Sequence, residues 1–205
     1  MLPGVERDDW NQRYATKELV WTAEANRFFA AEVAALPPGI ALDLAAGEGR
    51  NAVWLAERGW KVRAVDFSDV AVEKGKQLAS MRKVADRIDF RVEDLRDCEI
   101  EVGRFDLVAV LYLQIPQSEL VPILGRAARA VAPGGTFLLV AHDSTNLEHG
   151  YGGPQDERLL YDAARVVAAV GGELEIEKAG PVEREVKTDD GTRTAIDCLV
   201  RARRR

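Results

Sequence analysis

The stretch from Ala41 to Ala52 combines a short apolar run, two glycines and the start of a helix, as turns that bind nucleotide-like ligands do. Gly47 and Gly49 permit close approach of a ligand that a side chain would block, and a helix start offers unpaired N–H groups. Asp66 ends the next predicted strand, where a carboxylate can accept hydrogen bonds from ribose hydroxyls. We therefore expect a site for a ribose-containing cofactor; a tight turn that needs glycine only for packing is the simpler alternative.

His142 is the second candidate for chemistry, and it is one of only two histidines in the chain. It follows a predicted strand at 136–141, and because imidazole is partly neutral near pH 7 it suits a general base. The simpler alternative is that His142 hydrogen-bonds backbone at the strand end. Asp143 and Asn146 carry oxygen ligands of the kind that Mg²⁺ prefers, so they form a candidate metal site. Asp143 could instead take part in catalysis by orienting His142, or cap a turn.

Alternating apolar runs and helix-period segments predict the scaffold that positions these residues. Predicted strands cover 40–44, 61–65, 88–92, 105–111 and 136–141, and predicted helices cover 18–35, 51–58, 69–83 and 119–131. This alternation predicts a mainly parallel, doubly wound α/β sheet whose ligands bind beyond the carboxyl ends of the strands. The last third predicts a helix at 157–170, then strands at 173–177 and 194–200 that form a hairpin through Asp189-Asp190-Gly191.

The segment Asp43-Leu44-Ala45-Ala46-Gly47-Glu48-Gly49-Arg50-Asn51 resembles motif I of the class I S-adenosylmethionine (SAM)-dependent methyltransferases. More narrowly, the chain is similar to the tellurite-resistance and thiopurine methyltransferase branch, on segments that span most of its length: Trp10-Asn11-x-x-Tyr14, motif I, Val65-Asp66-Phe67-Ser68, Glu93-Asp94-Leu95 and Pro133-Gly134-Gly135-Thr136. The stretch from His142 to Asp197 resembles an actinobacterial subgroup that includes mycobacterial 1-O-methyltransferases of methylated mannosides.

The resemblance implies one Rossmann-like domain with a seven-stranded, mostly parallel, doubly wound sheet whose last strand is antiparallel. Residues 1–36 would form an N-terminal helical cover and residues 37–205 the catalytic core. In the cover, Trp10 and Tyr14 are spaced i and i+4, so they share one helix face. The resemblance implies that they close over the cofactor, and ring faces suit a sulfonium cation. Burial of both rings against the core is the alternative.

The resemblance also implies SAM as the cofactor and assigns roles to the residues of the turn. Gly47 and Gly49 would pass beneath the amino-acid part of SAM, Asp43 would face its ammonium, and Asp66 would hold both ribose hydroxyls. A pyrophosphate favours basic neighbours, whereas this turn carries Glu48, and a carboxylate-rich cleft suits a cation. That difference favours SAM over NAD.

Four further residues complete the implied cofactor site. Phe67 would lie against the adenine ring, Asp94 would accept from the adenine amino group, and Leu95 would supply a backbone N–H. Leu111, which ends the fourth predicted strand, is counted with the cofactor-binding residues. Ala46 stands where cysteine or glycine is more usual, and a small side chain is retained there.

We expect methyl transfer to a small-molecule acceptor, and we favour a hydroxyl, such as that of a sugar, because a base is needed to deprotonate an alcohol. The main alternative is a thiol or metalloid methyltransferase, which would not need His142. A NAD-dependent reductase and a non-catalytic SAM-binding protein remain further alternatives, because the same glycines serve each.

Composition limits the partners and the compartment. The chain has 28 basic and 34 acidic residues, a net charge of −6, and a pI near 5.1, so its surface repels a phosphate backbone and nucleic acid is not expected. The two cysteines form no Cys-x-x-Cys pair, and no stretch has the length of a signal peptide or membrane span. We expect a cytoplasmic protein, monomeric or homodimeric, with no membrane association.

Overall fold

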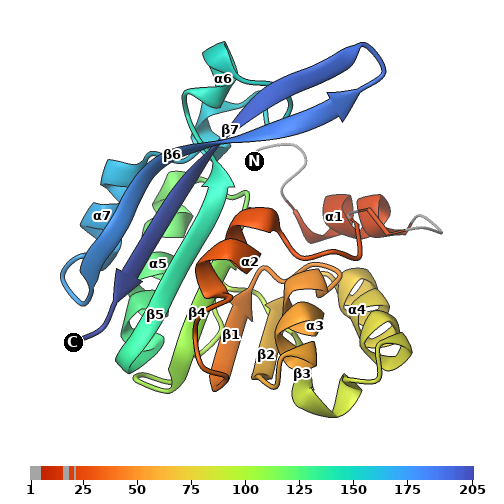
Figure 1. Ribbon diagram of the computed structural model, residues 1–205, viewed down its shortest axis with the longest axis vertical. Coiled ribbons are helices and arrows are strands. Elements are labelled where there is room, and N and C mark those ends of the chain that lie inside the picture. The colour runs from red at the N-terminus through yellow and green to blue at the C-terminus, as the bar shows by residue number, and fades with distance from the viewer. Residues whose placement is uncertain (1–5, 16–18, 21) are drawn as a thin grey trace.

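A seven-stranded sheet forms the centre of the molecule (Figure 1). The computed structural model describes residues 6–15, 19–20 and 22–205. Its strands are β1 (Ile40–Leu44), β2 (Lys61–Asp66), β3 (Ile88–Val92), β4 (Phe105–Leu111), β5 (Val131–His142), β6 (Glu175–Thr188) and β7 (Gly191–Arg203). They lie in the order β3-β2-β1-β4-β5-β7-β6.

The sheet is mixed. The four ladders among the first five strands are parallel: β1 with β2, β1 with β4, β2 with β3, and β4 with β5. Strand β7 is antiparallel to both of its neighbours, β5 and β6. The predicted mostly parallel sheet with an antiparallel last strand therefore describes this arrangement. Because β1, β2, β3, β4 and β5 run in the same direction, their carboxyl ends meet at one edge of the sheet.

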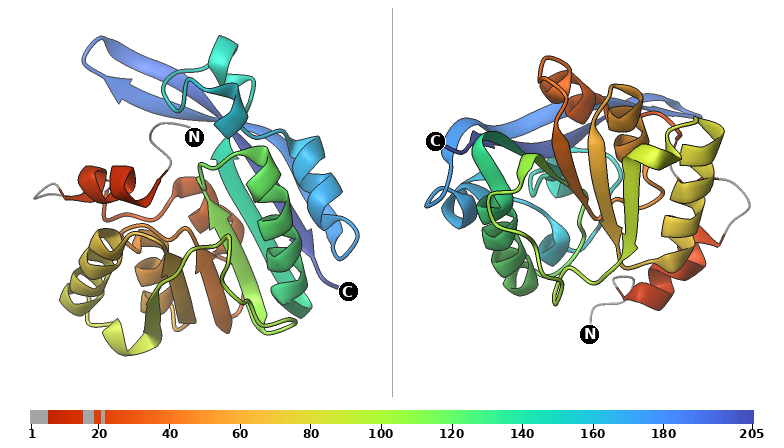
Figure 2. Two further views of the ribbon diagram at one scale, coloured as in Figure 1. Left: turned by 180° about the vertical axis from the view of Figure 1, so that it is seen from behind. Right: turned by 90° about the horizontal axis from the view of Figure 1, so that it is seen from below.

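Helices cover both faces of this sheet (Figure 2). The helices are α1 (Arg7–Tyr14), α2 (Arg27–Val33), α3 (Arg50–Glu57), α4 (Asp69–Met81), α5 (Gln117–Ala130), α6 (Asn146–His149) and α7 (Ala163–Val170). Apolar residues of α2, α3 and α4 form one core with one face of the strands, and those of α5 and α7 form the second core on the other face. Along β4, Leu107 and Ala109 belong to the first core and Val108 and Val110 to the second, as the period of two in a strand requires.

The predicted N-terminal helix at 18–35 is too long. Residues 22–26 are not helical, and α2 begins only at Arg27, because the Asn26 side chain accepts hydrogen bonds from the N–H groups of Phe28 and Phe29, both at 3.0 Å. Residues 18 and 21 of that prediction lie outside the described residues. The helical cover consists of α1, which packs beside α4, and the short α2.

The C-terminal predictions need two corrections. The predicted helix at 157–170 is interrupted at Tyr161, which is extended and bridges to Asp143, so α7 begins only after the cap at Asp162. The hairpin strands are much longer than predicted, since the polar stretch between them pairs up to Thr188 and Gly191.

Only the part of β7 from Asp197 to Arg203 pairs with β5. The rest of the β6–β7 hairpin extends past the end of the sheet as a two-stranded arm above the carboxyl ends of the strands (Figure 1). Because Arg184 stands between Val182 and Val186 on the half-buried face of β6, alternation of apolar residues does not identify this arm. Among the described residues, no helix is long and apolar enough to cross a lipid bilayer.

Candidate active site

The turn after β1 has an unusual backbone. Ala45, Gly47 and Gly49 have φ angles of 58°, 54° and 73°, in the left-handed region that glycine adopts most easily. The Gly47 N–H donates to Asp66 Oδ2 at 2.8 Å, which ties the turn to the end of β2. A Cβ at Gly47 would lie 2.8 Å from the hydroxyl oxygen of Tyr14. The turn, the end of β2 and helix α1 therefore meet at Gly47.

The second glycine has a packing role. Gly49 is the N-cap of α3, and a Cβ there would lie 2.8 Å from the ring of Phe90 on β3. Alanine in place of glycine strains the backbone at Ala45, which has a positive φ. It does not strain the backbone at Ala46, whose φ is not positive. The methyl group of Ala45 also contributes to the wall of both pockets described below.

Two buried carboxylates, Asp43 and Asp66, lie at the ends of β1 and β2. Neither carboxylate oxygen of Asp43 accepts a fully formed hydrogen bond from the residues that the structure describes. Burial, followed by the charge of Asp66, raises the pKa of Asp43 to about 7, against the charge of Arg50 and the nearby Ala52 N–H. Burial also raises the pKa of Asp66 to about 6, against the hydrogen bonds from the N–H groups of Ser68 and Gly47. The site therefore favours a cation, which would stabilise both carboxylates in their ionised forms.

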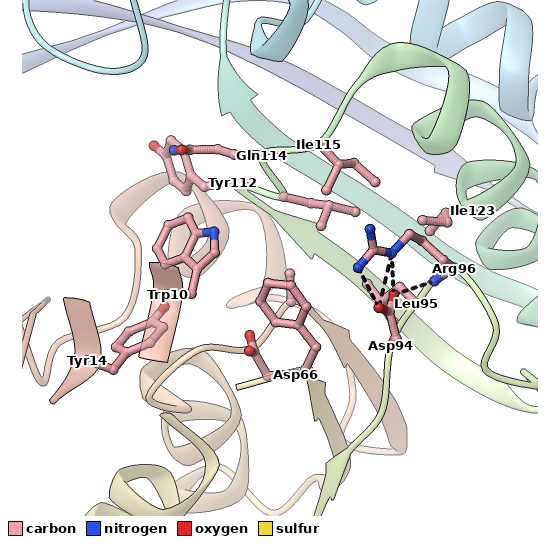
Figure 3. Close-up of a pocket in the computed structure, with 13 residues that line it drawn as sticks. Trp10, Tyr14, Asp66, Asp94, Leu95, Arg96, Tyr112, Gln114, Ile115 and Ile123 are labelled. Carbon is pink, nitrogen blue, oxygen red and sulfur yellow. Dashed lines mark hydrogen bonds and ion pairs between the residues drawn. The ribbon is translucent and has the colours of Figure 1, made fainter. Parts of the chain in front are cut away.

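One pocket, the β3 pocket, opens beside the ends of β2 and β3 (Figure 3). Its lining residues come from α1, from the ends of β2 and β3, and from the segment after β4: Trp10, Tyr14, Ala45, Asp66, Phe67, Asp94, Leu95, Arg96, Tyr112, Leu113, Gln114, Ile115 and Ile123. Trp10 and Tyr14 stack with their ring centroids 5.6 Å apart on one side of the pocket, and Asp94 lies on the other side. The prediction that both rings bury against the core alone is therefore incomplete, because they also form a wall of this pocket.

Asp94 is less available than the sequence predicts. Arg96 binds its carboxylate with Nε at 3.0 Å and Nη2 at 2.7 Å. Although partial burial raises the pKa of Asp94, the bonds and charge of Arg96 outweigh it and lower that pKa. Asp94 is thus an ionised acceptor that a ligand amino group would share with Arg96.

The second pocket, the β5 pocket, reaches from the turn to the end of β5. It contains Gly47, Leu111, His142 and the arm residues Arg184 and Glu185. It shares five lining residues with the β3 pocket, namely Trp10, Tyr14, Ala45, Tyr112 and Gln114. The two pockets are therefore adjacent, and ligands that occupied both would meet between the turn and Tyr112.

The His142 ring is held on three sides. The Tyr112 ring lies against it with centroids 4.8 Å apart, and a Cβ at Gly153 would lie 3.0 Å from Nδ1. Asp197 Oδ1 lies 3.3 Å from Nδ1, and the His142 side chain is only 11% exposed. Because Nδ1 faces Asp197, Nε2 is the nitrogen that faces the pocket.

The structure does not support the prediction that Asp143 orients His142. Asp143 Oδ1 accepts hydrogen bonds from the Thr145 N–H at 2.9 Å and the Thr145 hydroxyl at 2.7 Å, so this carboxylate caps a turn. Sequence reasoning missed Asp197, whose signal is a single carboxylate in the otherwise apolar run 195–200, and it missed Arg184 in the arm.

The predicted Mg²⁺ site at Asp143 and Asn146 is not supported. Asn146 Oδ1 accepts from the Ile196 N–H at 2.7 Å, and Asn146 Nδ2 donates to the Gly152 carbonyl at 2.8 Å, so its amide holds the loop to β7. Within the described part of the chain, no group of three or more His, Cys, Asp or Glu side chains is arranged to hold a metal ion.

The predicted cofactor residues divide into three groups by position. Trp10, Tyr14, Asp66, Phe67, Asp94 and Leu95 line the β3 pocket. Gly47 and Leu111 line the β5 pocket. Asp43 and Gly49 line neither pocket and lie behind the turn.

Comparison with known proteins gives one family match. Residues 41–135, just under half of the chain, match the model of a methyltransferase domain. A probable chloroplastic tocopherol O-methyltransferase from Oryza sativa subsp. japonica is 27% identical over 134 residues, which are 65% of this chain and 36% of that protein. The chain spans about a third of the length of this and two other curated relatives that it matches.

Solved structures share the fold over almost the whole chain. TehB from Haemophilus influenzae superposes with a TM-score of 0.74 at 17% identity, over 97% of this chain and 67% of that one. The N-methyltransferase NodS from Bradyrhizobium japonicum, solved with S-adenosyl-L-homocysteine, superposes with a TM-score of 0.72 at 15% identity, over 97% of both chains. At these identities the likeness establishes the fold.

Proposed function

We propose that this chain, whose residues 41–135 match a methyltransferase domain, transfers the methyl group of SAM to a hydroxyl of a small polar acceptor with His142 as general base. The observation that carries the proposal is the shared wall of the two pockets. It allows SAM, bound in the β3 pocket and along the glycine turn, and an acceptor in the rest of the β5 pocket to meet within reach of His142.

The residues at the edge of the sheet fit SAM. Asp66 keeps free lone pairs on its two oxygens for ribose hydroxyls, since each oxygen accepts one backbone N–H. Phe67 and Leu95 offer apolar contact to adenine, and Asp94 remains an acceptor for its amino group. A cationic ligand would favour the ionised form of the buried Asp43 carboxylate, whose pKa burial raises to about 7.

Glu48 supports this choice less than its sequence position implies. Its carboxylate is buried, accepts from the Val20 N–H at 3.1 Å and lies 3.4 Å from Lys74 Nζ. Its charge is therefore largely compensated, and Asp43 and Asp66 carry the argument for a cationic cofactor.

The chemistry asks little of the protein beyond position and a base. Bound SAM would supply a methyl group on a sulfonium, from which the neutral thioether is a good leaving group. The acceptor hydroxyl gives its proton to His142 Nε2 as its oxygen forms the new bond to the methyl carbon. Trp10 and Tyr14 of α1 form one part of the shared wall, where their rings exclude water from the reacting atoms.

A polar acceptor is favoured because, not counting its Trp and Tyr residues, ten of the twenty residues in the wall of the β5 pocket carry charged or hydrogen-bonding side chains. They are Thr22, Asn26, Arg27, Glu48, Arg50, Asn51, Gln114, His142, Arg184 and Glu185. An apolar acceptor would displace water from these polar side chains without offering them hydrogen bonds, which is costly. A sugar hydroxyl satisfies this requirement, and the O-methyltransferase among the relatives supports oxygen as the methylated atom.

The test measures methyl transfer from labelled SAM to mannosides, other sugars, catechols, thiols and tellurite, each with Mg²⁺ and with EDTA. We expect turnover of a hydroxyl acceptor that EDTA does not reduce and that His142→Ala lowers by about 10²–10⁴-fold. Turnover only on thiols or tellurite, unaffected by His142→Ala, would assign the protein to detoxification instead.

Calorimetry separates the remaining functions without an acceptor. We expect S-adenosylhomocysteine to bind and NADH not to bind. Binding of NADH alone would indicate a reductase, and tight binding of SAM with no turnover across the panel would indicate a non-catalytic SAM-binding protein.

A further inference from the structure

Asp197 and His142 are direct partners across two paired strands. The register of β5 and β7 places His142 opposite Asp197, at the last pair of that ladder. Their side chains lie against each other, with Nδ1 and Oδ1 3.3 Å apart. Each of these two atoms is buried, and neither has a fully formed hydrogen bond with any described residue. Two unsatisfied buried atoms therefore face each other, and a proton on Nδ1 would satisfy both.

The other oxygen of Asp197 is fully engaged. Its Oδ2 accepts from the Tyr112 hydroxyl at 2.9 Å and from Arg184 Nε at 2.7 Å, and Asp197 is completely buried. Asn26 Nδ2 donates in turn to the Tyr112 hydroxyl at 3.3 Å. Arg184 can only donate, so it fixes Oδ2 as an acceptor and holds the carboxylate in place. Oδ1 is then left to His142.

We infer that Asp197 is a positioning residue that holds the proton of neutral His142 on Nδ1 and thereby leaves the lone pair of Nε2 directed into the β5 pocket. This inference rests on the proposed function, because it explains how His142 can accept a proton from an acceptor hydroxyl. The arm contributes Arg184 from β6, so the β6–β7 hairpin takes part in organising the base. A carboxylate that orients imidazole in this way sets its tautomer without itself taking the proton.

The substitution Asp197→Asn tests this arrangement with little change in shape. Because Arg184 Nε must meet an acceptor, the amide oxygen of Asn would face Arg184 and its NH₂ group would face His142 Nδ1. Nδ1 would then have to accept, and the proton would move to Nε2. The variant therefore places a proton on the nitrogen that must act as base.

The tautomer is measured directly by long-range ¹H–¹⁵N correlation NMR at alkaline pH, where imidazole is neutral. The chain has only two histidines, so His149→Gln removes the second ring and assigns the spectrum. We expect the Nδ1–H form for the unsubstituted protein and the Nε2–H form for Asp197→Asn. We also expect Asp197→Asn to lower kcat by about 10²–10⁴-fold and to change the affinity for S-adenosylhomocysteine less than twofold.

Asp143→Asn is the matched comparison, since Asp143 is also buried, is adjacent to His142 in sequence and is engaged with Thr145. We expect it to keep the Nδ1–H form. An Nε2–H form in the unsubstituted protein would overturn the inference, and this measurement does not depend on whether any Asp197 variant folds. A change of tautomer in Asp143→Asn but not in Asp197→Asn would also overturn it. An Nδ1–H form together with full turnover of Asp197→Asn would instead overturn His142 as the base.

Discussion

Gly153 lies against the imidazole of His142, so that a Cβ at this position would be 3.0 Å from Nδ1 and 3.1 Å from Cγ. The φ angle of Gly153 is 77°, in the left-handed region. Both the conformation and the close approach therefore require glycine, and the loop after α6 fixes one side of the proposed base.

Gly153→Ala should lower turnover at least tenfold by displacing the His142 ring, while the affinity for S-adenosylhomocysteine stays unchanged. Gly152→Ala is the matched control, because Gly152 has a similar φ of 73° but nothing lies within 4 Å of its added Cβ. Steady-state kinetics and calorimetry on both variants check this. Equal losses in the two variants would attribute the effect to backbone strain rather than to His142.

Ala45→Gly should stabilise the protein. Ala45 has a φ of 58°, and a left-handed conformation costs a residue with a Cβ about 1 kcal/mol more than glycine. After the greater chain entropy of glycine is subtracted, a net gain of about 0.5 kcal/mol in the free energy of unfolding is expected. Urea denaturation measures it, and Ala46→Gly, where φ is not positive, should destabilise. A loss of stability in Ala45→Gly would contradict the assignment of strain to Ala45.

The ligand-free protein should lose stability as the pH rises from about 5 to 8. The folded state raises the pKa of Asp43 from 3.8 to about 7, so across this range it binds more protons than the unfolded chain, and the free energy of unfolding falls with pH. Asp43→Asn should reduce this loss in the free energy of unfolding by at least about 1 kcal/mol. Urea denaturation at both pH values checks it, with Asp190→Asn in the exposed hairpin turn as control. Equal slopes for Asp43→Asn and the unsubstituted protein would contradict the prediction.

The same two carboxylates should make SAM binding depend on pH. Burial raises the pKa of Asp66 to about 6 and that of Asp43 to about 7, and a cation favours their ionised forms. The affinity for SAM should therefore increase from pH 5 to 7.5, with release of protons on binding. Calorimetry in buffers of different ionisation enthalpy measures that release. If no protons are released, the pKa values of these carboxylates do not change when SAM binds.

Asn11→Ala should weaken cofactor binding about fivefold by loosening α1. Asn11 accepts from the Ser68 hydroxyl at 2.6 Å and donates to Asp69 Oδ1 at 2.9 Å, and these bonds hold α1, with Trp10 and Tyr14, over the pockets. Calorimetry with S-adenosylhomocysteine measures the change. Arg7→Ala is the control, because Arg7 makes only an exposed ion pair with the same Asp69, which contributes little. Equal effects would show that position along α1, not these bonds, matters.

The strands and the turn could be predicted because each is marked by local sequence. Strands β1, β3 and β4 begin and end at the predicted residues. The apolar runs of β1 and β4 are almost continuously buried, and in β3 apolar and charged residues alternate. Gly47, Asp66 and His142 end or follow strands that are parallel, so their placement at one edge follows from chain direction.

The β6–β7 arm and the partner of His142 could not be predicted in the same way. On the half-buried face of β6 in the arm, Arg184 stands between Val182 and Val186, so a charged residue interrupts the apolar alternation that marks a strand. Asp143 is adjacent to His142 in sequence, yet side chains of consecutive strand residues point to opposite faces, so it is directed away from His142.

The amino-acid sequence by itself determined the alternation of strands and helices, the glycine turn and the carboxylate at the end of β2, because backbone conformation and burial period are local properties. Only the tertiary structure decided that Asp197, 55 residues from His142, faces its ring, that Arg184 and Tyr112 hold that carboxylate, and that Asp143 caps a turn. The register of two antiparallel strands sets which side chains meet, and that register depends on packing across the whole sheet rather than on any neighbouring residue.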